Sequence, residues 1–222
     1  MDSFQRAPLL YFDFDNTITV GDVLDRVIAR YSASESWREW EAQWQAGTMT
    51  TRECLRRQVG DLRATREELL RFMAEVTIDP AFAAIVAWAA RHGVELAILS
   101  DNFTPLIAEI LRRHRLESVP VFANALTFEG DRPEAHFPFH DPACPRCAHC
   151  KAQHLRARAG SVRLFVGDGL SDVCGALAAD IVFAKDSLAA ELKKRGVAFH
   201  GYESLGDVLR FLEVHHGRAS VA

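Results

Sequence analysis

The sequence has no stretch that approaches the roughly 20 consecutive apolar residues that a membrane-spanning helix needs. Its first residues, MDSFQRAPLLYFDFDNT, lack a basic segment followed by an uninterrupted apolar run, because two aspartates interrupt the only hydrophobic stretch there. We therefore expect neither a secretory signal nor a membrane partner, and we predict a cytoplasmic protein.

The sequence also lacks an excess of basic charge. Its 26 Lys and Arg residues are outnumbered by 30 Asp and Glu residues, which gives a formal net charge of -4 at pH 7. Proteins that bind the nucleic-acid backbone normally carry clustered basic charge. The composition therefore predicts no nucleic-acid partner, and it leaves the oligomeric state open.

The sequence contains few cysteines, and their number is odd. Three of the 5 cysteines are crowded at Cys144, Cys147 and Cys150, unlike the framework of a disulfide-stapled secreted domain. His140 and His149 lie nearby as fourth ligands for a metal. Structural zinc sites need four ligands, however, usually arranged as two separated pairs. One compact stretch therefore favours a loop of reduced, uncoordinated thiols, with a zinc site as the alternative.

Short apolar runs that end in polar residues alternate with helical patterns. Residues 7–14, APLLYFDF, end in carboxylates, as is typical of a buried strand. The runs VELAILS, VRLFVG and DIVFAK also end beside polar clusters. This alternation predicts an α/β fold with a Rossmann-like parallel sheet. Ligands of such sheets bind beyond the carboxyl ends of the strands, where Asp13, Ser100 and Asp168 fall.

Residues 21–82 carry helical patterns only. Successive amphipathic patterns run from DVLDRVIARY to TREELLRFMAEV with no strand signal among them. A chain of 222 residues can hold one sizeable core and a modest insertion. We therefore predict a core domain of residues 1–20 and 83–222, and an all-helical cap domain of residues 21–82 inserted after the first strand.

The sharpest motif is DFDNT at residues 13–17. Along an extended strand the side chains of residues 13 and 15 point to one side, so two carboxylates would face one cleft. The alternative is a strand-ending loop with solvated aspartates.

A second motif, GDGLSD at residues 167–172, follows an apolar run, and its glycines let the backbone approach a ligand closely. Mg²⁺ prefers oxygen ligands, usually one or two carboxylates and several waters, and Asp13 and Asp168 can supply those carboxylates. Asp172 would hold a metal-bound water or position a lysine; the alternative is a simple acidic residue at a helix start.

Together these features resemble the four motifs of the haloacid dehalogenase superfamily, in the same order and over nearly the whole chain. The combination is specific because all four must occur together on alternating strands and helices. The matching elements are Asp13-x-Asp15-x-Thr17, a strand-ending Ser100, Lys151, and Gly167-Asp168-x-x-x-Asp172.

The resemblance narrows to the phosphoserine-phosphatase-like branch. DFDNTITVGD, the cysteines before Lys151 and VGDGLSDVCGALAADIVFAKD look most like the 2-hydroxy-3-keto-5-methylthiopentenyl-1-phosphate phosphatases of methionine salvage. A phosphoethanolamine and phosphocholine phosphatase family also carries cysteines before this lysine. Phosphoserine is a weaker candidate, because the phosphoserine enzyme typically has glutamate where this chain has Asp22.

The resemblance implies a phosphatase that acts on a small phosphorylated metabolite with Mg²⁺ as cofactor. Asp13 would form a phosphoaspartyl intermediate and Asp15 would serve as acid and base. Lys185 is the rival of Lys151, but it follows Asp168 and so breaks the family order. The implied catalytic residues are Asp13, Asp15, Thr17, Ser100 and Lys151; the implied metal ligands are Asp13, Asp15, Asp168 and Asp172; and the implied substrate contacts are Asp22, Arg57, Asp101, Asn102 and Gly169.

Two other functions stay open at this point. A phosphotransferase would pass the phosphoryl group to an alcohol, and a regulator would bind a metabolite without turning it over. The intact motifs argue against the regulator. Asp15 argues against a dehalogenase or a P-type ATPase, whose first motifs lack this acid.

Overall fold

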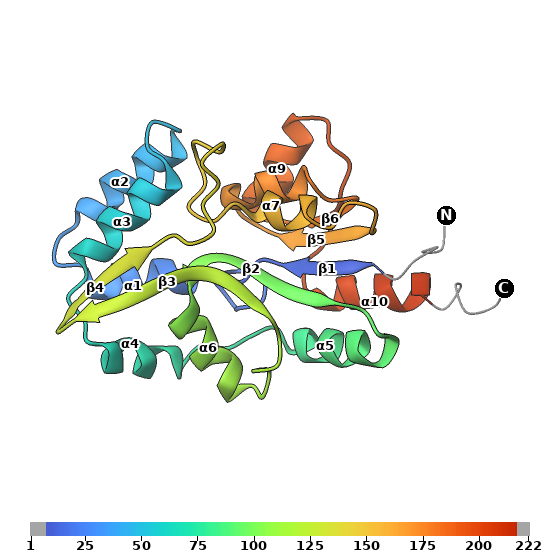
Figure 1. Cartoon of the computed structure of the whole chain (residues 1–222), viewed down its shortest axis with the longest axis horizontal. Coiled ribbons are helices and arrows are strands. Elements are labelled where there is room, and N and C mark those ends of the chain that lie inside the picture. The colour runs from blue at the N-terminus through green and yellow to red at the C-terminus, as the bar shows by residue number, and fades with distance from the viewer. Residues whose placement is uncertain (1–7, 217–222) are drawn as a thin grey trace. The chain divides into compact units, whose positions relative to one another are not determined.

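The computed structural model describes residues 8–216 as an α/β fold, which confirms the predicted fold class (Figure 1). The strands of this part are β1 (Leu9–Phe12), β2 (Leu96–Phe103), β3 (Val121–Glu129), β4 (Arg132–His136), β5 (Arg163–Gly167), β6 (Ile181–Ala184) and β7 (His200–Gly201). Its helices are α1 (Val23–Tyr31), α2 (Ser36–Gln45), α3 (Thr51–Asp61), α4 (Arg66–Met73), α5 (Pro80–His92), α6 (Thr104–Arg113), α7 (Lys151–Arg156), α8 (Val173–Ala176), α9 (Asp186–Lys194) and α10 (Leu205–His216), with a 3-10 turn η1 (Leu170–Asp172).

The strands are hydrogen-bonded in the order β4-β3-β2-β1-β5-β6-β7. By their contacts the described residues group into two compact units, the first of 8–20, 78–99 and 151–216, and the second of 21–77 and 100–150. Residues 100–150 thus group with the helices of the predicted cap. The predicted division into a catalytic core and a cap stays a prediction.

The first unit is built on parallel strands. Strand β1 pairs with β2, where Phe12 lies opposite Ile98, and with β5, where Phe12 lies opposite Val166. Strand β5 continues to β6, and β6 to β7. All four residues of β1 are buried, which explains why its sequence is a continuous apolar run rather than an alternating one. Burial of each such large side chain contributes about 1.5–3 kcal/mol relative to exposure.

Asp79 holds the start of two helices of this unit. One carboxylate oxygen accepts a hydrogen bond from the Ala81 N–H at 2.8 Å and caps α5, which has Pro80 in its first turn. The other oxygen accepts from the Leu205 N–H at 2.8 Å, at the start of α10. Helices α5 and α10 pack together. At its other end α5 stops at Gly93, whose φ of 63° is the left-handed conformation that glycine adopts readily.

The second unit contains four consecutive helices, α1 to α4, as the sequence patterns predicted. Asp22, Thr50 and Thr65 cap three of them through their side-chain oxygens. The sequence analysis did not predict the antiparallel hairpin of β3 and β4 in this unit. The hairpin turns at Gly130, with φ 64°, and α3 packs against β4.

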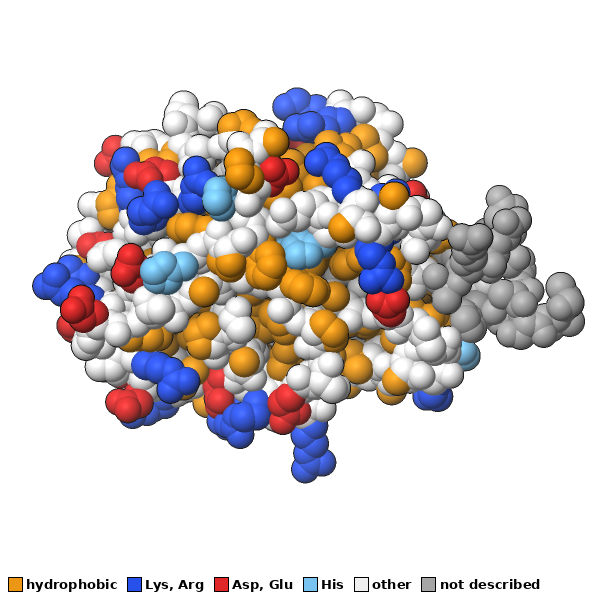
Figure 2. Space-filling view, in the orientation of Figure 1, with side chains coloured by type: hydrophobic (Ala, Val, Ile, Leu, Met, Phe, Trp, Pro, Cys, Tyr) orange, Lys and Arg blue, Asp and Glu red, His pale blue; other side chains and the backbone are white. Residues whose placement is uncertain are grey.

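None of the helices within residues 8–216 combines the length and the apolar character needed to cross a membrane. On the described part of the face drawn in Figure 2, basic and acidic side chains are interspersed over the surface. The absence of a nucleic-acid partner stays a prediction.

Candidate active site

Two neighbouring parallel strands of the first unit place carboxylates at the same edge. Strand β1 ends just before Asp13, and β5 ends at Gly167, just before Asp168. The Asp13 N–H donates to the Val166 carbonyl at 2.9 Å, so the pairing continues past the end of β1. The carboxyl ends of parallel strands are where such sheets bind ligands.

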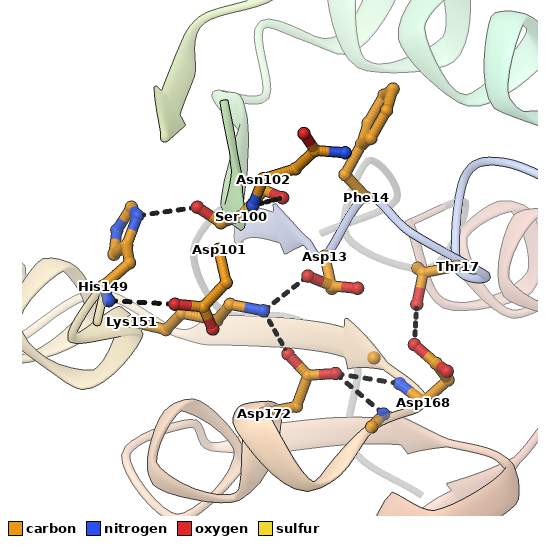
Figure 3. A network of polar contacts seen from close by, with 12 residues as sticks. Asp13, Phe14, Thr17, Ser100, Asp101, Asn102, His149, Lys151, Asp168 and Asp172 are labelled. Atoms are coloured by element: carbon orange, nitrogen blue, oxygen red, sulfur yellow. Dashed lines mark hydrogen bonds and ion pairs between the residues drawn. The ribbon is translucent and has the colours of Figure 1, made fainter. Parts of the chain in front are cut away.

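Lys151 places a basic side chain at the carboxyl ends of these strands. It is the first residue of α7, and its side chain is only 1% exposed. Its Nζ donates to Asp13 Oδ1 and to Asp172 Oδ1, the latter at 2.5 Å, as Figure 3 shows. The rival lysine, Lys185, lies instead over the ring of Tyr202, with Nζ 5.4 Å from its centroid. The structure therefore brings Lys151, not Lys185, into contact with Asp13.

Asp172 organises the loop after β5. Its Oδ2 accepts hydrogen bonds from the backbone N–H groups of Asp168 and Gly169, both at 3.0 Å. A Cβ on Gly167 would lie 2.6 Å from that same oxygen, so only glycine leaves room for this contact. Asp172 thus contacts the lysine, as one of the sequence hypotheses proposed, and it is completely buried.

Asp168 is oriented by two residues of the turn that follows Asp13. The Thr17 hydroxyl donates to its Oδ1 at 3.0 Å, and the Asn16 side-chain amide donates to its Oδ2 at 2.8 Å. The Asn16 amide also donates to Asp186 Oδ2 at 3.0 Å. The sequence analysis assigned no role to Asn16. Asn16 has a φ of 53°, a conformation in which asparagine is enriched. An asparagine directly after the two aspartates was therefore the signal in the sequence for a tight turn at this position.

The site carries more negative charge than its lysine can neutralise. One carboxylate oxygen each of Asp13, Asp168 and Asp172 lies within 4.8 Å of the others. Burial, and next the charge of Asp172, raise the pKa of Asp13 well above its ordinary value, and the same two causes raise the pKa of Asp168. A compact set of oxygen donors with uncompensated charge suits a hard divalent cation.

Asp15 is placed differently from the sequence argument. That argument put Asp13 and Asp15 on one extended strand, and this geometry is wrong, because β1 ends at Phe12 and Asp15 already begins a turn over 15–18. The turn is held by hydrogen bonds from the backbone N–H groups of Ile18 and Thr19 to the Phe14 carbonyl, at 2.9 and 3.0 Å. Asp15 is half-buried, whereas Asp13 is only 6% exposed.

The remaining expected site residues, apart from Gly169, belong to the second unit, where each has partners of its own. The Ser100 hydroxyl accepts from the Asn102 N–H at 3.0 Å, and both residues are buried. Asp101 Oδ1 accepts from the His149 N–H at 2.9 Å. Asp22 caps α1 through the Asp25 N–H at 2.8 Å, and Arg57 pairs with Glu53 at 2.8 Å. Their roles toward a substrate stay predictions.

We expect Asn16→Gly to weaken divalent-cation binding by about 10–100-fold, the usual cost of losing a group that orients a metal ligand. Glycine keeps the left-handed backbone and removes only the amide that fixes Asp168. Calorimetric titration of the metal-free protein measures the affinity. Ser187→Ala is the matched control, because the Ser187 hydroxyl donates to the backbone carbonyl of Asp168, at 3.3 Å, and not to its carboxylate. Equal affinities in Asn16→Gly and the unmodified chain would contradict the expectation.

Comparison with known proteins gives one family match. The model of the family described as haloacid dehalogenase-like hydrolase matches residues 10–176. Among curated proteins, a 2-hydroxy-3-keto-5-methylthiopentenyl-1-phosphate phosphatase of Brevibacillus brevis is 29% identical over 215 residues, covering 92% of this chain and 95% of that protein. A polyol phosphate phosphatase of Saccharomyces cerevisiae is 23% identical over 234 residues, covering 96% of each chain.

Solved structures share the fold. A phospho-aspartyl intermediate analogue of a phosphoserine phosphatase superposes with a TM-score of 0.70 at 19% identity, covering 93% of this chain and 99% of that one. A substrate-bound phosphoserine phosphatase complex gives a TM-score of 0.71 at 18% identity, covering 93% and 98%. At these identities the likeness concerns the fold alone.

Proposed function

Because the chain belongs to the haloacid dehalogenase-like hydrolases and is a phosphoric monoester hydrolase, we propose that it dephosphorylates a small metabolite through a phosphoaspartyl intermediate on Asp13, with Mg²⁺ as cofactor. The observation that carries the proposal is the buried contact of Asp13 with Lys151, beside the oxygens of Asp168 and Asp172. Hydrolysis of phosphate monoesters is so slow without a catalyst that no single carboxylate could suffice.

Asp13 attacks the phosphorus atom, forming a bond from its carboxylate oxygen while the bond to the departing alkoxide breaks. The attacking carboxylate has to be ionised, although burial and Asp172 raise its pKa. Lys151 opposes that rise, because its ammonium contacts both carboxylates. The oxygens of Asp13, Asp168 and Asp172, which lie within 4.8 Å of one another, would hold Mg²⁺, and the bound cation would offset the repulsion between the anionic nucleophile and the phosphate.

Asp15 carries the proton in both steps. It protonates the departing alkoxide, and it then takes a proton from the water that attacks the phosphoaspartate. That attack breaks the bond to Asp13 and releases inorganic phosphate. The half-buried position of Asp15 in the turn supports this role, because an acid-base group has to exchange protons with solvent while the nucleophile stays shielded.

The other motif residues bind and position. We assign Ser100 and Lys151 to the phosphoryl oxygens, where charge develops during transfer. Ser100 lies two residues beyond Ile98, the partner of Phe12 across β1 and β2. Thr17 acts through its hydrogen bond to Asp168 rather than on the substrate. The substrate contacts proposed for Asp22, Arg57, Asp101, Asn102 and Gly169 rest on the family resemblance.

The substrate we put first is 2-hydroxy-3-keto-5-methylthiopentenyl-1-phosphate. The Brevibacillus brevis phosphatase named for it matches this chain over 92% of its length. Phosphoethanolamine, phosphocholine and phosphoserine are the alternatives from the sequence, and polyol phosphates are added by the Saccharomyces cerevisiae relative. A cytoplasmic location stays part of the proposal.

Phosphate release from this panel of substrates tests the proposal. With the preferred substrate, chelation of divalent cations should lower the rate by about 100-fold or more, because the cation supplies several kcal/mol of charge stabilisation. Added Mg²⁺ should restore the rate. Activity that survives complete chelation would rule out the cofactor assignment. Transfer of phosphate to added alcohols would indicate a phosphotransferase, and binding without turnover would indicate a regulator.

A further inference from the structure

The loop between β4 and α7 gathers three sulfur atoms. Residues 137–150 contain no helix or strand, and loops of this length without secondary structure are uncommon in compact domains and usually functional. The Sγ atoms of Cys144, Cys147 and Cys150 all lie within 4.8 Å of one another, and those of Cys144 and Cys147 are 3.2 Å apart. The folded loop thus brings the three thiol groups close together.

The backbone around the cysteines is held by hydrogen bonds within the second unit. The Cys144 N–H donates to the Asp141 carbonyl and the Cys150 N–H to the Phe139 carbonyl, both at 2.9 Å. The Thr51 N–H, at the start of α3, donates to the Arg146 carbonyl at 2.9 Å. The loop therefore presents its sulfurs from a fixed frame, which is the preorganisation that a metal site needs.

The spacing of the sulfurs fits one tetrahedral ion better than a disulfide. Zinc–sulfur bonds of about 2.3 Å place the sulfurs of a tetrahedral site about 3.8 Å apart. The Cys144 and Cys147 sulfurs are 3.2 Å apart and all three sulfurs lie within 4.8 Å of one another, so small shifts would bring them to that spacing. None of the cysteines, all of which lie within residues 8–216, forms a disulfide, and a disulfide here would use two of the three sulfurs and leave the third out.

Asp141 lies beside the sulfur cluster but outside it. Its Oδ2 is 3.9 Å from Cys150 Sγ, whereas no carboxylate oxygen of residues 8–216 joins the group of three sulfurs that lie within 4.8 Å of one another. Its Oδ1 accepts from the Ala143 N–H at 2.9 Å, which orients the carboxylate. The histidines considered from sequence are engaged elsewhere through Nδ1, His140 with the Phe137 carbonyl at 3.2 Å and His149 with the Ser100 carbonyl at 3.0 Å.

We propose that the thiolates of Cys144, Cys147 and Cys150, with a water molecule as fourth ligand, bind one zinc ion at a site separate from the carboxylate cluster, and that Asp141 orients Cys150 beside it. Binding converts the thiols to thiolates and releases their protons to solvent. Soft sulfur ligands suit zinc and hard oxygen ligands suit magnesium. The cysteine site would therefore select zinc, and the carboxylate cluster would select magnesium. Cys150 directly precedes Lys151 in the chain, so the ion would brace the segment that leads into the catalytic lysine.

The test is the metal content of the full chain, purified from a zinc-supplemented culture and dialysed against metal-free buffer. We expect about one zinc ion per chain. Cys147→Ser should reduce this to a small fraction, whereas Cys174→Ser, outside the loop, should retain it. Asp141→Asn should weaken zinc binding by about tenfold, the usual cost of losing a group that orients a metal ligand. Asp13→Asn should retain zinc, because it alters only the carboxylate cluster.

Cobalt substitution of the unmodified chain gives a second measurement that does not depend on how variants fold. Thiolate-to-cobalt charge-transfer bands, with the intense visible bands of tetrahedral cobalt, would support the site. The proposal is overturned by substoichiometric zinc without these bands, by a disulfide between Cys144 and Cys147 in the freshly purified protein, or by zinc that persists when all three cysteines are serine.

Discussion

Replacing Asp13 by asparagine is expected to lower kcat by about 10⁴-fold or more, the scale on which enzymes lose activity when a nucleophile is removed. The amide has nearly the same shape but cannot form the acyl phosphate. The fold should persist, because Lys151 keeps Asp172 as its partner and burial disfavours the charge that the substitution removes. Steady-state phosphate release, with thermal unfolding of the same samples, measures both effects.

Asp180→Asn is the matched control for Asp13→Asn. Asp180 lies in the same unit but pairs on the surface with Arg163, at 2.8 Å. Surface ion pairs contribute at most about 1 kcal/mol, so this variant should keep its activity. Trapping of radiolabelled phosphate on the unmodified chain, and its absence in Asp13→Asn, would locate the intermediate. Turnover by Asp13→Asn at the rate of the unmodified chain would disprove the mechanism.

Replacing Lys151 by methionine is expected to destabilise the metal-free protein by about 3–5 kcal/mol at neutral pH, the usual cost of removing one partner from a buried ion pair. Methionine fills similar space but leaves the carboxylates of Asp13 and Asp172 without their shared cation. Phosphate release should also fall, because the nucleophile loses the charge that favours its ionised form. Denaturant unfolding in the presence of chelator measures the free energy.

The pH dependence of this loss has a definite sign. Burial and Asp172 already raise the pKa of Asp13 in the folded chain, and removal of the lysine leaves nothing in the pair to oppose them. A group whose pKa is raised on folding binds its proton more tightly in the folded state, so it favours folding at low pH and loses that contribution as pH rises through the folded pKa. The deficit of Lys151→Met relative to the unmodified chain should therefore shrink as the pH is lowered from neutrality.

Asp172→Asn in the Lys151→Met background separates charge from packing. If uncompensated charge causes the loss, the double variant should recover part of the stability, because one of the two unpaired carboxylates is gone. No recovery, together with a deficit that does not change with pH, would show that packing of the lysine stem is the cause. Lys194→Met is the control, since its Nζ lies 3.7 Å from Glu191 on an exposed helix face.

Much of the fold followed from local patterns. The apolar runs that became β1, β5 and β6 and the helical patterns that became α1 to α4 all appear at the expected places. The hairpin of β3 and β4 was missed, because its residues are mostly exposed or half-buried and so carry a weak strand pattern. Sequence also put Asp15 on a strand, since a single residue type does not mark where β1 ends and the turn begins.

By itself the sequence determined the chemistry on offer: the order of the four motifs, the presence of two aspartates in the first, and the crowding of three cysteines before a lysine. Residue types and their spacing along the chain are enough to recognise each of these features. Only the tertiary structure decided which groups meet. It selected Lys151 over Lys185 as the partner of Asp13, joined Asn16 to Asp168, and brought three thiols within reach of one ion. Those contacts depend on strand register and loop closure, which bring together residues as far apart as Asp13 and Lys151, and no local pattern encodes such a distance.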